Sequence, residues 1–257
     1  MYKISFGFER EIFVVKLSKV KKANDTLVFR NELNSIVFPS SFTARDYDIF
    51  FTICWYVKQH DYDDARDYID MPFDEIARFY EKDLNKTRFC NEIKEFCKKA
   101  LGNNGTPIIR YEDDEKLRLS TFFMYLEPMR NKQILRLKMF KYSLNILFAV
   151  FDFMNINMRD FVSIHGKFSK TLYRLLKQYE NLKADDNGFK TITFSKNKLL
   201  EFMNFDNNFY GNSSEIDRKI LNPAIKELKD TFFKDLSVEK IKKNKREVVG
   251  YSFQVIF

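Results

Sequence analysis

The sequence contains few glycines and prolines, which interrupt regular structure, and few cysteines, which form disulfide bonds in small folds. It has only 7 glycines and 5 prolines among 257 residues, which argues against long linkers and low-complexity segments. Its three cysteines are too few, and odd in number, for a disulfide scaffold, so we expect a reducing, cytoplasmic location. No stretch reaches the roughly 18 uncharged apolar residues of a membrane helix, and the first ten residues lack the apolar core of a signal peptide.

Signatures of catalysis and of metal binding are also missing. The chain has no Gly-rich phosphate loop of the P-loop pattern and no Gly-x-Ser-x-Gly elbow. His60 and His165 stand apart, whereas rolling-circle nicking enzymes carry paired metal-binding histidines beside a catalytic tyrosine. The acidic loop at 61–70 lacks the spacing and the central glycine of a calcium loop. We therefore predict no enzyme activity, no cofactor and no metal, with a metal-dependent nicking enzyme as the alternative from another class.

Aromatic and basic residues are abundant. The chain contains 29 Phe, and 45% of its residues are hydrophobic, which is enough for a large core in two domains of roughly 120 residues. Cys90 and Cys97 fall on the apolar side of one predicted helix, so we interpret them as core residues. The formal net charge is +8, which suits a polyanionic partner without proving one.

The first half of the chain predicts a helix-turn-helix unit followed by a β-hairpin. Strand-like alternation over 26–38 precedes a helix that is apolar nearly all round and ends near Lys58, with N-caps available at Ser40, Ser41 and Thr43. Further elements are predicted in this order: a short helix at 73–80, a turn at 83–86, a helix at 87–101 that stops at Gly102, and strands at 108–111, 117–126 and 134–140. The last two strands are expected to form a wing, which completes the winged-helix order.

The same order recurs in the second half. The pattern predicts helices at 169–182, 195–203 and from 214 onward, and strands at 191–194, 236–241 and 248–257. In the hairpin between the last two strands, five of the seven residues from Lys240 to Arg246 are Lys or Arg and none is acidic. We therefore predict an α+β fold of two tandem winged-helix domains, with an N-terminal segment at 1–25, a first domain at 26–158 and a second at 159–257.

The helix that begins near Ser214 has one apolar side and one polar side, which suits a helix that lies in a DNA groove. Pro223 is expected to kink this helix, and Asp217 is expected to act as a cap or as an ion-pair partner. Guanidinium groups suit guanine edges, amides suit adenine, and ammonium groups and helix N-termini suit phosphates. The candidate DNA-binding residues of this unit are Ser213, Ser214, Arg218, Lys219, Asn222, Lys226, Lys242, Lys243, Lys245 and Arg246.

The corresponding helix of the first unit has a less basic polar side, so we expect it to contact the DNA backbone more than the bases. Its candidate residues are Lys86, Thr87, Arg88, Asn91, Lys94 and Lys98. In either unit, the solvent-exposed face of an ordinary helix would show a similar pattern. A purely structural protein is therefore an alternative that remains open.

Three phrases of the second unit resemble the Rep initiators of iteron-containing, theta-replicating plasmids, the family that includes RepE, RepA and the pi protein. Residues 172–179 (LYRLLKQY) are similar to the family's Leu-Tyr-x-Leu-Leu-x-x-Tyr helix. Residues 220–228 (ILNPAIKEL) resemble its recognition-helix phrase, and 249–253 (VGYSF) resemble its closing strand. The resemblance covers about 161–257. The chain departs from the family where Arg218 and Lys219 stand beside acidic Glu215 and Asp217, since family recognition helices are often richer in arginine.

The resemblance implies a protein that binds direct repeats of its origin as a monomer and helps to open an adjacent A/T-rich segment. It also implies dimers that repress the initiator gene at an operator inverted repeat, with the first domain supplying most of the dimer contact. The implied partners are duplex DNA, a second copy of the chain, the host initiator DnaA, the replicative helicase and chaperones. A winged-helix transcription regulator without an origin function is the alternative that the same residues would serve.

Overall fold

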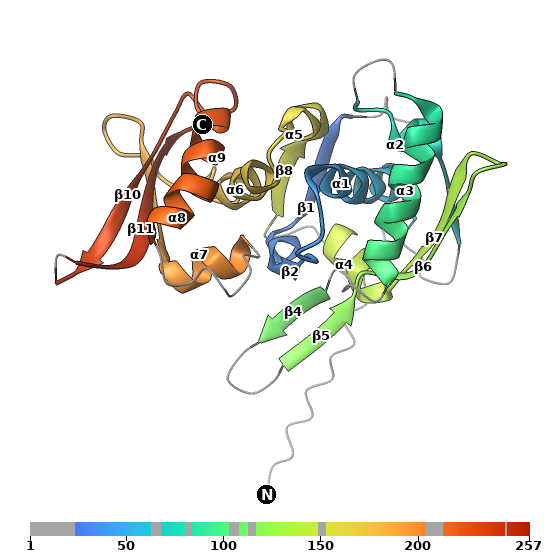
Figure 1. Ribbon diagram of the computed structural model, residues 1–257, viewed down its shortest axis with the longest axis horizontal. Helices are drawn as coiled ribbons and strands as arrows, with labels where there is room; N and C mark the ends of the chain where they lie inside the picture. Colours follow the sequence, from blue (N-terminus) through green and yellow to red (C-terminus); the bar gives the residue numbers. More distant parts are fainter. Residues whose placement is uncertain are drawn as a thin grey trace, which may run out of the picture.

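The computed structural model describes residues 24–62, 68–80, 84–102, 108–112, 117–148, 153–203, 213–244 and 246–257. Figure 1 shows two bodies side by side, the second half of the chain on the left and the first half on the right, with helices α1 (Ala44–Gln59) and α6 (Lys167–Lys177) between them. Each body combines helices with a β-hairpin. The prediction of an α+β fold with two winged-helix domains is confirmed.

The first body follows the predicted order closely around its helices. Helix α1 begins at a capping box, in which the Thr43 hydroxyl accepts a hydrogen bond from the Asp46 amide and the Thr43 amide donates to the Asp46 carboxylate at 2.7 Å. The other elements are β3 (Ile69–Pro72), α2 (Phe73–Ile76), α3 (Lys86–Leu101), β6 (Phe123–Met129) and β7 (Ile134–Met139). Strands β6 and β7 pair antiparallel and form the wing of this domain, with β3 on the other side of β7.

Two segments that we expected to be single strands are each divided. Residues 26–38 form β1 (Thr26–Arg30), a 3₁₀ turn at Asn31–Ser35 and β2 (Ile36–Val37), and the turn sends β2 to a different sheet from β1. Residues 117–126 form β5 (Leu117–Thr121) and β6, separated at Phe122, so only the second part belongs to the wing. The first part pairs with residues 108–112 and the second with β7, so the chain changes sheets at Phe122, whose side chain is fully buried.

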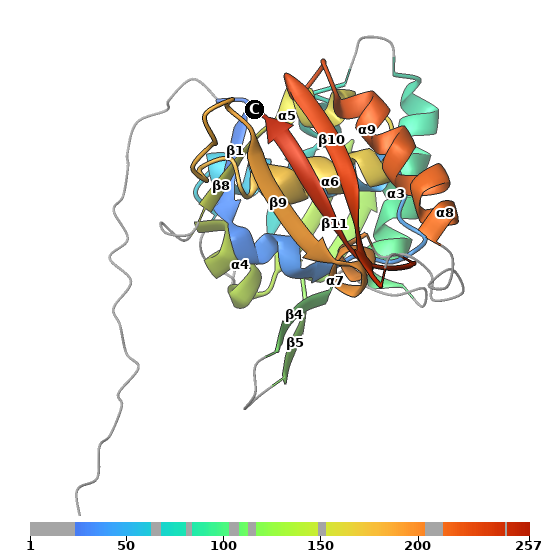
Figure 2. The same cartoon turned by 90° about the vertical axis from the view of Figure 1, so that its left-hand side faces the viewer.

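Strand β5 pairs instead with β4 (Ile108–Glu112), and β2 pairs with β4 on its other edge. The β4–β5 hairpin extends away from the body of the protein in both views (Figures 1 and 2). Four elements were not predicted: β3, α4 (Lys141–Phe148), β8 (Phe153–Asn157) and α5 (Met158–Ser163). Strand β8 pairs antiparallel with β1, which closes the first domain by joining its two ends in the sequence.

The second body contains the predicted elements with small shifts in their ends. They are α6, β9 (Lys190–Ser195), α7 (Lys196–Phe202), α8 (Ser213–Ile216), a π turn at Asp217–Leu221, α9 (Asn222–Leu228), β10 (Asp235–Lys243) and β11 (Glu247–Ile256). The sheet order is β10–β11–β9, so β10 and β11 form the expected basic hairpin. The domain limits at 25/26 and 158/159 stay predictions, since α6 contacts both α1 and α9.

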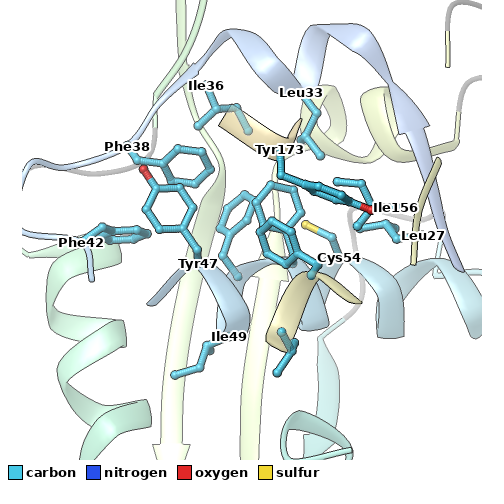
Figure 3. Packing of buried hydrophobic residues seen from close by; sticks show 14 of the residues in the cluster. Leu27, Leu33, Ile36, Phe38, Phe42, Tyr47, Ile49, Cys54, Ile156 and Tyr173 are labelled. Atoms are coloured by element: carbon cyan, nitrogen blue, oxygen red, sulfur yellow. The ribbon is translucent and has the colours of Figure 1, made fainter. Parts of the chain in front are cut away.

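The core explains the abundance of phenylalanine. Phe38, Phe42, Tyr47 and Phe50 pack around α1, with Phe38 and Phe50 edge to face at 5.0 Å between ring centroids. Figure 3 shows this cluster together with Cys54 and with Tyr173 of α6. All three cysteines are buried thiols, which confirms the prediction for Cys90 and Cys97. The buried cluster continues from α1 through α6 into the second domain, so one core supports both halves of the chain.

Candidate nucleic-acid interface

The helical segment from Ser213 to Leu228 presents the polar side that the sequence predicted. Its apolar residues are buried: Ile216, Ile220, Leu221, Ala224 and Leu228. The candidate residues Ser214, Arg218, Lys219, Asn222 and Lys226 are exposed, and Ser213 is half-buried. The helical spacing therefore places these candidates along one accessible surface, as expected.

Pro223 changes the path of this helix in a specific way. A proline has no amide hydrogen, and its ring crowds the carbonyl one turn earlier. The five residues before Asn222 adopt a π turn, in which the Asn222 amide donates to the carbonyl of Asp217 instead of Arg218. Such single π turns are frequent at functional sites. The expected irregularity at Pro223 is thus present, and it shifts Arg218 and Lys219 relative to Lys226.

Glu215 binds both basic residues of the π turn. Its carboxylate accepts hydrogen bonds from the Arg218 guanidinium at 3.0–3.3 Å and lies 2.7 Å from Nζ of Lys219. Hydrogen bonds from Arg218 and then Lys219 lower the pKa of Glu215 to about 2. The Arg218 side chain is nevertheless 68% exposed. The guanidinium is therefore held in one place while its outer side stays open to a ligand.

Asp217 connects this helix to the wing. It forms an ion pair with Lys240 of β10, which confirms the expected role as an ion-pair partner. Lys240 was counted among the basic residues of the hairpin, but this pairing neutralises it. The cations nearer the tip of the wing are therefore the stronger candidates for binding an anionic partner.

The wing extends its basic residues into solvent. Lys242 pairs with Val248 and Lys243 with Glu247, after a register shift between Ile241 and Lys242. Lys242, Lys243 and Arg246 are exposed, and Lys245 lies outside the described residues. Next to this register shift, Gly250 pairs with Ile241 and lets β11 approach β9 closely, because a Cβ there would lie 2.7 Å from the carbonyl oxygen of Phe194.

Helix α3 of the first domain is also amphipathic and exposed where predicted. Asn85, which the sequence analysis placed in a turn, caps it through a bond from the Arg88 amide. The candidate residues of this helix are all exposed: Lys86, Thr87, Arg88, Asn91, Lys94 and Lys98. Figures 1 and 2 place α3 and α8–α9 on the same face of the protein.

Much of the positive charge around α3 is neutralised within the domain. Glu92 pairs with Arg88 and with Arg45 of α1, each at 3.0 Å, and Glu95 pairs with Lys98 at 2.6 Å. Among the described residues, Lys86 and Lys94 are the candidates of this helix for which no ion pair is seen. Ion pairing therefore lowers the available positive charge of α3 further than its sequence alone indicated.

The arrangement of these exposed residues suits the binding of a partner more than the catalysis of a reaction. Among the described residues, no group of three or more His, Cys, Asp or Glu side chains is placed to hold a metal ion. No described helix is long and apolar enough to cross a membrane. Three residues that connect the two helices to the rest of the protein were not predicted from the sequence: Arg45, Lys99 and Glu227. Their partners lie 47 to 62 positions away, so spacing along one helix contains no signal for them.

Comparisons with solved structures agree with this fold. The chain is similar to the pi initiator protein, solved in complex with iteron DNA, with a TM-score of 0.69 and 16% identity. The match covers 92% of this chain and 98% of that one. Domains 2 and 3 of RctB match with a TM-score of 0.47 and 11% identity, over 84% of this chain and 82% of theirs. A search of curated proteins found no significant match.

Two family models match the sequence itself. The model described as "Initiator Replication protein, WH1" matches residues 26–177, and "Initiator Rep protein, WH2" matches residues 195–255. Together they cover both winged-helix domains, and the first alone spans more than half of the chain. The resemblance drawn from residues 172–179, 220–228 and 249–253 is confirmed. The chain belongs to the initiator replication protein family.

Proposed function

We propose that this initiator binds directly repeated sites, or iterons, in the double-stranded DNA of a plasmid origin. The observation that carries the proposal is the common face of α3 and α8–α9, with exposed cations along both helices and on the adjoining wing. Two helices on one face suit two successive segments of major groove. Unpaired ammonium groups suit the phosphates between them.

In this proposal the two domains contribute differently. Helix α8–α9 lies in a major groove, where Arg218 suits a guanine edge and Asn222 an adenine edge. Lys242, Lys243 and Arg246 of the wing lie along phosphates. Helix α3 contributes contacts to the backbone, because most of its arginine and lysine charge is already paired.

The similarity to the pi initiator, which was solved in complex with iteron DNA, supports duplex DNA as the ligand. We propose further that the chain acts in the cytoplasm without catalysing a reaction. Repression of its own gene as a dimer, and contacts with DnaA, the helicase and chaperones, belong to the same proposal and rest on the family resemblance.

The test is footprinting of the purified protein on the DNA that flanks its own gene, at two salt concentrations and with random duplex as competitor. Protection of regularly spaced direct repeats that survives competition would support the proposal. Protection of one palindrome alone would favour a transcription regulator. Metal-dependent cleavage of single-stranded origin DNA, measured in parallel, would favour a nicking enzyme instead.

A further inference from the structure

The two DNA-facing helices are joined through the interior by a chain of polar contacts that crosses the domain boundary. The contacts run from α9 to α6, from α6 to α1, and from α1 to α3. We call the five side chains involved the positioning network: Glu227, Lys170, Asp48, Asp46 and Lys99.

The first link joins the recognition helix to α6. The Glu227 carboxylate accepts hydrogen bonds from the backbone amides of His165 at 2.6 Å and Gly166 at 3.1 Å. Gly166 is the N-cap of α6 and supplies no side-chain cap of its own, so Glu227 takes over the capping of this helix. A Cβ at Gly166 would lie 2.7 Å from a Glu227 oxygen, so a larger residue there would require the Glu227 carboxylate to shift.

The second link joins α6 to α1 of the first domain. Nζ of Lys170 lies 2.6 Å from Oδ1 of Asp48, and both side chains are almost completely buried. One turn earlier on α6, Lys167 donates a hydrogen bond to the carbonyl oxygen of Ser40 at 2.8 Å, just before α1 begins. Two contacts along one helix hold both its position and its rotation.

The third link joins α1 to α3. Nζ of Lys99, in the last turn of α3, lies 2.7 Å from Oδ2 of Asp46, whose side chain is 5% exposed. The same carboxylate closes the capping box at the start of α1. A second contact between these helices, Arg45 with Glu92, lies on the open side at 3.0 Å.

The apolar core alone does not fix the relation between the helices so closely. Apolar burial is non-directional, whereas a hydrogen bond to a charged group has a preferred length and direction. We propose that the positioning network fixes the distance and rotation between α3 and α8–α9, and thereby sets the spacing of the two DNA segments that one molecule can contact. This inference rests on the proposed function, since it assumes that both helices contact DNA.

Two variants remove one link at each end of the network: Glu227→Ala and Lys99→Met. Asp186→Ala and Lys183→Met are matched controls, because each removes the same charge from an exposed loop of the second domain. None of the four substituted residues is a candidate DNA-contacting residue. Circular dichroism and thermal melting establish that each variant is folded before it is compared.

The first measurement needs no DNA. Spin labels on Asn91→Cys of α3 and Lys226→Cys of α9 report the distance between the helices by pulsed electron resonance, and the native cysteines are buried. We expect one narrow distance distribution in the protein with an intact network and in both controls. A broader or shifted distribution is expected for Glu227→Ala and Lys99→Met. Unchanged distributions in both variants would overturn the inference.

The second measurement uses the protected repeat found by footprinting and the same duplex with one base pair inserted between the two contacted segments. The insertion rotates one segment by roughly 35° relative to the other, and we expect the unmodified protein to lose at least about tenfold in affinity. The network variants should lose less than about threefold on insertion while binding the original repeat more weakly. Controls should behave like the unmodified protein.

The outcomes separate the inference from the proposed function. If the unmodified protein discriminates against the insertion and the variants discriminate equally well, the inference fails and the proposed function stands. If the unmodified protein binds no repeat, both fail. If it binds the repeat but is indifferent to the insertion, the inference fails and repeat binding itself stands. A merely structural role of Glu227 would lower affinity for both duplexes by the same factor and would leave the discrimination unchanged, which also contradicts the inference.

Discussion

Helix α3 of the first domain and the α8–α9 segment of the second occupy equivalent places in two winged-helix domains, yet their surfaces differ. Helix α3 is one regular helix of 16 residues whose exposed Arg88 shares Glu92 with Arg45. The α8–α9 segment contains a π turn next to Pro223 and is tied to its wing by Asp217 and Lys240. The same order of elements can therefore support two kinds of surface, depending on where acidic side chains sit.

The wings differ in the same direction. The β10–β11 hairpin exposes Lys242, Lys243 and Arg246, whereas the β6–β7 hairpin exposes Arg130 and Lys132 at its turn and pairs Arg136 with Asp70 of the neighbouring strand β3. Binding to phosphates releases counterions in proportion to the cations engaged. We therefore expect the second domain to supply most of the salt-dependent affinity, and the predictions below test this asymmetry.

The largest effect is expected from removing three cations of one domain at a time. The triple variant Lys242→Ala, Lys243→Ala, Arg246→Ala should lower affinity for every duplex by about a hundredfold and reduce the salt slope by about 2.7. The matched triple variant of α3, Lys86→Ala, Lys94→Ala, Lys98→Ala, should have a smaller effect, because Lys98 is already paired with Glu95. Fluorescence anisotropy at several salt concentrations measures both. Equal losses would contradict the asymmetry.

The next effect compares Arg218 of the α8–α9 segment, a candidate for reading a base, with Arg88 of α3. Arg218→Ala should weaken binding to the specific repeat by about tenfold to a hundredfold and relax the preference at one base pair. Arg88→Ala should change specific and random duplexes alike, and by less than about fivefold. Competition binding with single-base variants of the repeat separates the two. An equal loss on random DNA for Arg218→Ala would reassign Arg218 to a phosphate.

A smaller effect is expected at the contact between the recognition helix and its wing. Asp217→Ala frees Lys240 and removes a carboxylate, so the salt slope on random duplex should increase by up to about 0.9. The free energy of unfolding should fall by less than about 1 kcal/mol, because the pair is partly exposed. Anisotropy titration and urea unfolding measure the two quantities. An unchanged slope would mean that Lys240 lies out of reach of DNA even when it is unpaired.

The smallest effect is a local titration that compares the two helices directly. Arg218→Ala should raise the pKa of Glu215 from about 2 toward its ordinary value, since the hydrogen bonds from Arg218 are the main cause of the lowering. Lys98→Ala should raise the lowered pKa of Glu95 by a smaller amount, because Lys98 donates one hydrogen bond to Glu95 whereas Arg218 donates three to Glu215. Carboxyl-carbon NMR titration measures each. A Glu215 pKa that does not move would show that the pair is absent in solution.

Local patterns along the chain predicted much of the fold and of the candidate site. Helical spacing placed Ile216, Ile220 and Leu228 in the core and their polar neighbours outside, because side chains three and four positions apart share a face. The pairing of Glu215 with Arg218 and Lys219 is also readable from spacing, since such neighbours meet on a helix surface. The assignment of individual residues to DNA stays a prediction.

The divided strands could not be predicted in the same way. Alternation over 26–38 and 117–126 is continuous in the sequence, but the chain breaks at Asn31–Ser35 and at Phe122. The first break follows from distant partners, since β1 pairs with β8 and β2 with β4. The second occurs because β5 pairs with the preceding strand β4 and β6 with the following strand β7. Competition between partners for the same backbone hydrogen bonds is a tertiary effect that overrides local propensity.

The two winged-helix units, the basic wing, the buried cysteines and the family could be predicted from local sequence, because each of these depends on residues that are near one another in the chain. Which cations are paired, and how α3 and α8–α9 are joined, depends on the tertiary structure. Lys240 is neutralised by Asp217, and Glu227 caps a helix that begins 60 positions earlier. Charge pairing and capping act across space through distances of a few ångströms, and those distances exist only once the core has brought the elements together.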